Sequence, residues 1–148
     1  MNILRTFTLA LGIIYFIVGI LGFFPGLMSA PPANAPAMSS PYGLLFGLFP
    51  VNSLHNVVHL ILGAWGILAY RDIEDSRLYA RSLAVIYAVL GVFGFIPALN
   101  TIFGLIPLFG HDIWLHLLTA AAAAYVGYMM PVTAQMGHAT QPDKSRHV

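Results

Sequence analysis

Two halves of this sequence repeat each other, and the repetition limits the possible folds more than any other feature. Residues 14–27, IYFIVGILGFFPGL, align with residues 86–99, IYAVLGVFGFIPAL, at an offset of 72. Residues 46–60, FGLFPVNSLHNVVHL, align with residues 103–117, FGLIPLFGHDIWLHL, at an offset of 57. The sequence therefore predicts a tandem repeat of a two-helix unit, with units at about 5–70 and 77–130 and a longer first connecting loop.

Four apolar stretches are long enough to cross a membrane. A bilayer takes about 20 predominantly apolar residues, and the qualifying segments are 7–24, 53–70, 78–96 and 112–130. Only 7% of the residues are charged, whereas a soluble domain carries about a quarter. We therefore expect an all-α, polytopic membrane protein with four transmembrane helices in one domain, residues 1–132. Each unit returns the chain to its starting side, so the repeats should be parallel.

The segments between these stretches are polar or rich in turn residues. Residues 29–41, SAPPANAPAMSSP, predict an irregular loop, and residues 70–81, YRDIEDSRLYAR, predict a solvated, charged loop. Residues 133–148 predict a polar, disordered tail. The first apolar stretch has features of a secretory signal peptide, but its recurrence inside the chain argues against cleavage.

The distribution of positive charge predicts an orientation. All six Lys and Arg residues lie in segments on one side of the predicted membrane: Arg5, Arg71, Arg77, Arg81, Lys144 and Arg146. The positive-inside rule places both termini in the cytoplasm, and the starts of the second and fourth helices then lie at the outer face. The net charge of +1 does not favour nucleic-acid binding, and the lack of cysteine excludes disulfides, thiolate zinc sites and iron–sulfur clusters.

Polar side chains lie at the outer ends of the second and fourth predicted helices. Asn52, His55 and His59 follow one another by single helical turns, and Asp112 and His116 repeat that spacing. Small residues continue both stripes, and small residues allow membrane helices to approach closely. We expect the two stripes to pack together, with His59 and His116 as symmetry-related partners and His111 able to turn inward. The small residues are Gly63, Gly66, Ala120 and Ala123.

Two interpretations of these histidines remain open. The structural one, which we favour, requires only that buried imidazoles find hydrogen-bond partners such as Asp112, while Asn52 caps its helix. The other is a ligand site. His55, His59, Asp112 and His116 would suit zinc, iron or copper, or His59 and His116 would ligate a tetrapyrrole.

The motifs around these residues also resemble a known family. They are Phe49-Pro50-Val51-Asn52, Leu54-His55-Asn56, Val58-His59-Leu60, the segment RLYAR at 77–81, and Trp114-Leu115-His116-Leu117. Over about residues 5–127 the sequence resembles the bacterial four-helix membrane proteins described as domain of unknown function 4383. The resemblance implies an integral protein of the inner membrane and carries over no established catalytic residues.

The expected role is non-enzymatic. We predict an accessory or scaffolding subunit of a larger membrane complex without a bound cofactor. Its partners would be the lipid bilayer and other membrane proteins or further copies of itself, with no nucleic acid. The alternative is a metal- or tetrapyrrole-binding membrane protein that uses the outer histidine cluster. A small transporter is a third possibility, because parallel repeats occur in transporters.

Overall fold

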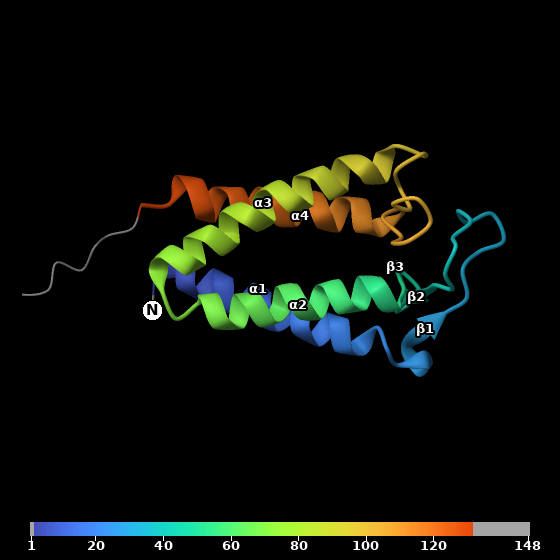
Figure 1. The fold of residues 1–148 in the computed structure, drawn as a ribbon, viewed down its shortest axis with the longest axis horizontal. Coiled ribbons are helices and arrows are strands. Elements are labelled where there is room, and N and C mark those ends of the chain that lie inside the picture. The colour runs from blue at the N-terminus through green and yellow to red at the C-terminus, as the bar shows by residue number, and fades with distance from the viewer. Residues whose placement is uncertain (1, 132–148) are drawn as a thin grey trace, which may run out of the picture.

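The chain folds into helices that run along one long axis (Figure 1). The computed structural model describes residues 2–131, so the predicted tail at 133–148, with Lys144 and Arg146, lies outside the described residues. The α-helices are α1 (Ile3–Leu21), α2 (Ser53–Ala69), α3 (Ile73–Phe95) and α4 (His111–Ala124). A π-helical turn, η2 (Tyr125–Met129), extends α4, and a short 3₁₀ helix, η1 (Pro25–Leu27), follows α1. The mostly helical prediction is confirmed.

The length of two helices matches the requirement for a membrane span. α1 has 19 residues and α3 has 23, and each contains an apolar window with few charges. α2 is a shorter apolar helix of 17 residues. The prediction of membrane-spanning helices is therefore met by length and composition at α1 and α3.

Side-chain caps set where the helices begin. Asn2 accepts a hydrogen bond from the backbone N–H of Arg5, Asn52 accepts one from His55, and Asp72 accepts from Glu74 and Asp75. Such caps satisfy amide groups that have no partner within the helix. Because Asp72 caps α3, the charged residues after it are helical. Residues 73–77, predicted as part of a solvated loop, are therefore helical, and the helix predicted from residue 78 begins at Ile73.

A small antiparallel sheet, which the sequence did not predict, forms on either side of the predicted irregular loop at 29–41. Its strands are β1 (Met28–Ser29), β2 (Gly43–Leu45) and β3 (Phe49–Val51), in the order β1–β2–β3 among the described residues. Pro50 lies opposite Leu44 on the edge strand β3, where a missing N–H is tolerated. Phe46 and Gly47 adopt positive φ angles of 54° and 72° in the turn before β3. The sheet leads directly into α2.

The helices α1 and α2 form a hairpin and pack so closely that their backbones are in contact. A Cβ added at Gly66 would lie 2.8 Å from the Cα of Gly12 on α1 and 2.8 Å from the Tyr79 hydroxyl oxygen on α3. A Cβ added at Gly63 would collide with the backbone of Phe16. The predicted packing of the Gly63 and Gly66 stripe against the fourth helix is therefore wrong, since these glycines face α1.

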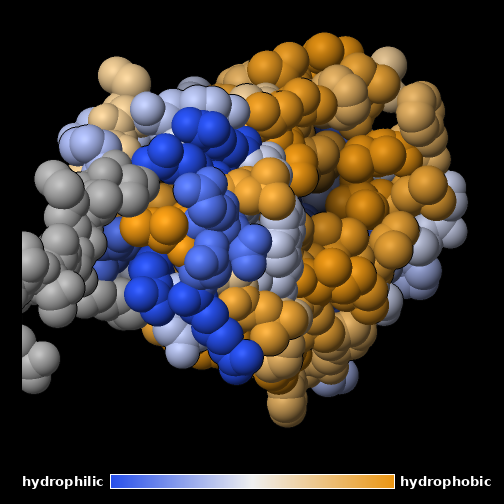
Figure 2. Space-filling model, turned by 60° about the vertical axis from the view of Figure 1, so that its left-hand side comes forward, coloured by the Kyte–Doolittle hydropathy of each residue, from blue (hydrophilic) through white to orange (hydrophobic). Residues whose placement is uncertain are grey.

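The core joins the hairpins α1–α2 and α3–α4, which form two layers in Figure 1. Its buried members come from all of the α-helices: Tyr15, Ala69, Tyr79, Leu83, Ala84, Tyr87, Ala120 and Ala123. Ala120 and Ala123 therefore do face inward, into this core cluster, whereas the glycines of α2 face α1. Hydrophilic residues gather at the end where α1 begins, whereas hydrophobic residues cover the flank (Figure 2).

Candidate metal centre

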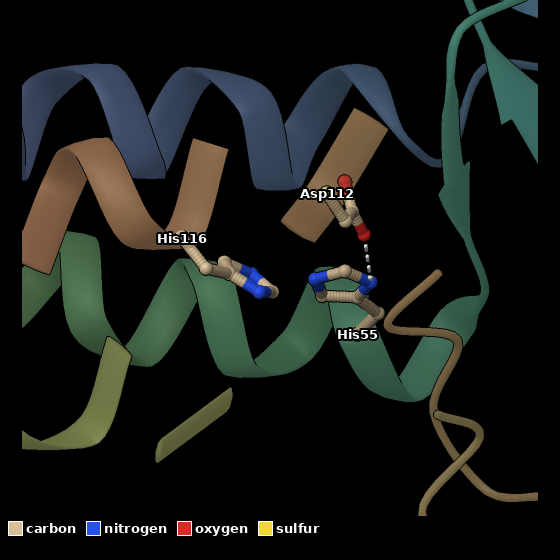
Figure 3. A group of neighbouring side chains, drawn as sticks. All are labelled: His55, Asp112 and His116. Carbon is tan, nitrogen blue, oxygen red and sulfur yellow. Dashed lines mark ion pairs between the residues drawn. The ribbon is translucent and has the colours of Figure 1, made fainter. Parts of the chain in front are cut away.

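Three side chains with metal-binding atoms converge at the other end of the bundle. His55 comes from α2, and Asp112 and His116 come from α4 (Figure 3). One ligand atom from each residue lies within 4.8 Å of the corresponding atoms of the other two. The relative exposures are 4%, 2% and 2%, so all three side chains are buried. Asp112 and His116 are four residues apart and therefore share one face of α4.

Asn52 fixes the start of α2 and so positions His55. Its side-chain oxygen accepts the His55 N–H at 2.9 Å, and its side-chain amide donates to the Leu105 carbonyl at 2.6 Å. The same amide donates to the Ser40 hydroxyl at 2.9 Å. Asn52 therefore ties the first loop, the helix start and the α3–α4 connection together. The predicted cap is confirmed, and its bonds to the two loops were not predicted.

The carboxylate of Asp112 lies near His55 without forming a hydrogen bond to it. The distance from His55 Nδ1 to Asp112 Oδ2 is 3.9 Å, longer than a hydrogen bond between these atom types. His55 Nδ1, Asp112 Oδ2 and His116 Nδ1 are all buried without a hydrogen-bond partner among the described residues. Nearly all buried polar atoms in proteins have partners. One ligand atom of each of these three residues lies within 4.8 Å of those of the other two, so a single cation could contact all three residues.

Aromatic rings enclose the inner side of the site. His59 lies one turn below His55, with 4.4 Å between the ring centroids. The Tyr15 ring lies 5.2 Å from His59, and the Tyr87 ring lies 5.0 Å from His116. Tyr15 and Tyr87 stack on each other at 5.3 Å, and the Tyr15 hydroxyl donates to Thr119 at 3.3 Å. This packing keeps the imidazoles in fixed positions.

The predicted site residues are brought together in part. His55, Asp112 and His116 form the close group, and His59 adjoins it through His55. His111 does not turn inward, because its side chain is exposed and its ring lies edge-to-face against Phe49 at 6.3 Å. The tyrosine pair was not predicted as part of the site. The match of Tyr15 with Tyr87 at the repeat offset was the signal that pointed to it.

A family model matches residues 5–129 of the chain, which is most of its length. The chain belongs to the family described as domain of unknown function 4383. The family resemblance in the motifs from Phe49 to Leu60 is thereby confirmed, and its description assigns no activity to this domain 4383 protein. No curated protein and no solved structure matches the chain.

Proposed function

We propose that this domain 4383 protein is a non-enzymatic integral membrane protein that binds one divalent transition-metal ion between α2 and α4. The observation that carries the proposal is the close, buried group of His55, Asp112 and His116. Two imidazole nitrogens and one carboxylate oxygen suit zinc, iron or copper. His59 adjoins this group through His55, with 4.4 Å between the ring centroids, but is not one of its three members.

The ion would link the two hairpins. His55 belongs to the α1–α2 hairpin, whereas Asp112 and His116 belong to the α3–α4 hairpin. Each hairpin packs closely within itself: Gly12 approaches Gly66 in the first, and Gly91 approaches Leu117 in the second. A metal ion bound by both hairpins would fix their relative position at the site. This role requires no substrate, and it therefore agrees with the non-enzymatic prediction.

A small ion fits this geometry better than a tetrapyrrole. The ring of His59 packs against Tyr15, and the ring of His116 packs against Tyr87, at about the distance of stacked aromatic side chains. A macrocycle between His59 and His116 would have to displace this tyrosine pair. An ion would contact only the three ligand side chains, which already lie close together.

We also propose that all of the α-helices cross the inner membrane, with the chain built as a tandem repeat and both termini cytoplasmic. Equivalent contacts support the repeat. An added Cβ at Gly19 would press on Leu60, and one at Gly91 would press on Leu117. The pairs correspond at the offsets of 72 and 57 found in the sequence. The arginines at one end of the bundle support the orientation.

We also propose that the protein acts as an accessory subunit of a larger membrane complex, a role that does not depend on the ion. Large apolar side chains are exposed along the helices, as at Ile17, Val92 and Leu118. In a membrane these side chains would contact lipid or other membrane proteins. Identification of proteins that co-purify in gentle detergent would test this role: stoichiometric membrane partners would support it, and a homogeneous protein without them would argue against it.

Elemental analysis tests the metal site directly. The protein is purified from native membranes in mild detergent without chelator, and its metal content and thermal midpoint are measured. We expect about one zinc, iron or copper ion per chain, with loss of the ion and a lower midpoint in His116→Ala. His111→Ala is the matched control, because this neighbouring histidine is exposed and outside the group. A wild type without ion, whose midpoint none of the three metals raises, would overturn the proposal.

A further inference from the structure

A groove lies at the end of the bundle where α4 finishes, opposite the metal centre. Its volume is about 370 Å³, and its walls are Arg81, Ser82, Val85 and Ile86 of α3 and Tyr128 of η2. Val85 is 57% exposed and Ile86 is 39% exposed, so the floor of the groove is apolar and open. The groove thus combines one cation, Arg81, and the hydroxyls of Ser82 and Tyr128 with an apolar surface that continues along α3.

The guanidinium of Arg81 is held in place. Its Nε donates to the Gly127 carbonyl at 2.9 Å, and its central carbon lies 4.9 Å from the centroid of the Tyr128 ring. An arginine has five N–H donors, and this bond uses one of them. Within residues 2–131, no Asp or Glu carboxylate lies within ion-pair distance of Arg81. Its charge is therefore available to an anion.

A second arginine adds to the positive potential. Arg77 precedes Arg81 by one helical turn and is half-buried, and its terminal amino group donates to the Met130 carbonyl at 3.5 Å. Its Nε is buried without a hydrogen-bond partner among the described residues. Like charges four residues apart on a helix repel each other. An anion bound beside them would offset this repulsion.

We propose that the groove binds an anionic phospholipid of the cytoplasmic leaflet. The phosphate would accept hydrogen bonds from the Arg81 guanidinium and the Ser82 hydroxyl, and an acyl chain would cover Val85 and Ile86. Arginine binds phosphate with paired hydrogen bonds, and basic residues at the membrane surface attract anionic lipids. A free phosphate would leave the apolar floor uncovered, which favours the lipid. The inference depends on the membrane placement in the proposed function.

Lipid-dependent thermal stability tests the site. The full chain is delipidated in neutral detergent and titrated with phosphatidylglycerol, phosphatidylcholine or inorganic phosphate. We expect only phosphatidylglycerol to raise the thermal midpoint. Arg81→Gln should weaken its apparent affinity about fivefold or more, the equivalent of roughly 1 kcal/mol for one basic residue. Arg71→Gln removes the same charge from an exposed position outside the groove and should leave the response unchanged.

A second pair of variants addresses the apolar floor and does not disturb Arg81. Val85→Trp would fill the groove, whereas Val89→Trp adds the same bulk at an exposed position on α3 outside it. We expect only Val85→Trp to reduce the response. Equal responses in Val85→Trp and Val89→Trp, or in the two arginine variants, would overturn the lipid site. A response to inorganic phosphate equal to that of phosphatidylglycerol would also overturn it, in favour of a free anion.

The lipid site and the membrane placement can be tested separately. Recovery of the protein in the membrane fraction tests the membrane placement separately. If the protein is in that fraction but does not respond to phosphatidylglycerol, the lipid site alone is wrong. If it is absent from that fraction, the membrane placement itself is wrong, and the lipid proposal falls with it.

Discussion

At the scale of single residues, the proposed metal ligands are buried, lie close to one another and have atoms without a hydrogen-bond partner among the described residues. His55 Nδ1 and Asp112 Oδ2 are 3.9 Å apart, and neither has a hydrogen bond within the described part of the chain. A metal ion with bonds of about 2.0–2.2 Å to nitrogen and oxygen would occupy the space between such atoms. His59 lies next to this group but is not one of its three members.

The distinction between His116 and His59 gives the first prediction. We expect His116→Asn to lose the bound ion, because it removes one of three ligands, whereas His59→Gln should retain the ion with weaker affinity. The measurement is metal content after dialysis against a weak chelator. Both variants should fold, since an amide keeps some hydrogen-bonding capacity. Retention of the ion by His116→Asn and its loss from His59→Gln would reassign the ligands.

Gly66 gives the second prediction. We expect Gly66→Ala to destabilise the protein by about 1–3 kcal/mol, because the new methyl group would be forced against Gly12 and Tyr79. Gly26→Ala is the control, since an added Cβ there meets nothing within 4 Å. The thermal midpoints of both variants in matched detergent would be compared with the wild type. Similar midpoints for the two variants would rule out the close contact between α1 and α2.

The same residues show what the sequence could and could not predict about the site. The four-residue spacing of His55 and His59 placed them on one face of a helix, and the repeat brought Asp112 and His116 into consideration. Sequence periodicity gives the polar face of a helix but does not say which neighbour that face meets. For this reason the glycines of α2 were assigned to the wrong partner helix, and His111 was expected to turn inward.

At the scale of elements, side-chain caps explain most of the differences between predicted and observed boundaries. The third helix begins at Ile73 rather than at residue 78, because the Asp72 cap makes the charged segment helical. Apolar content alone identifies the part of a helix that can cross a bilayer, and it misses polar turns that continue the same helix. The sheet β1–β2–β3 was missed because strands of two or three residues are too short to show alternation.

The Asp72 cap gives a prediction about pH. Hydrogen bonds from the backbone N–H groups of Asp75 and Glu74 lower the pKa of the Asp72 carboxyl. Since the folded pKa is below the unfolded value, the charged carboxylate stabilises the fold above about pH 3.9. This contribution is lost as the pH falls through the lower folded pKa. We therefore expect the difference in thermal midpoint between wild type and Asp72→Ala to shrink between pH 5 and pH 3.

The matched variant for this experiment is Asp72→Asn. An asparagine can still cap the helix, but its amide does not titrate in this range. The difference between Asp72→Asn and Asp72→Ala should therefore stay constant with pH. A constant difference between wild type and Asp72→Ala as well would show that the carboxylate charge contributes nothing.

At the scale of the whole molecule, the arrangement of the ends predicts the membrane topology. The chain has no cysteine, so single introduced cysteines can be labelled without background. We expect Ala33→Cys, in the exposed first loop, to react with an impermeant thiol reagent on intact spheroplasts. Asp75→Cys, exposed at the opposite end, should react only after permeabilisation. The reverse pattern would show the opposite orientation, with the start of α3 outside the cell. Labelling of both positions from outside would exclude a membrane-spanning first hairpin.

The bonds of Asn52 also have a consequence for the order in which the molecule is made. Its amide donates to the carbonyl of Leu105, which lies 53 residues later in the chain. At roughly 5–20 residues per second, a ribosome needs several seconds to cover that distance. During synthesis the first connection therefore lacks this hydrogen bond until Leu105 has been made. In a nascent chain arrested between the two hairpins, we expect this loop to be sensitive to protease. In the completed protein, we expect the same loop to be resistant.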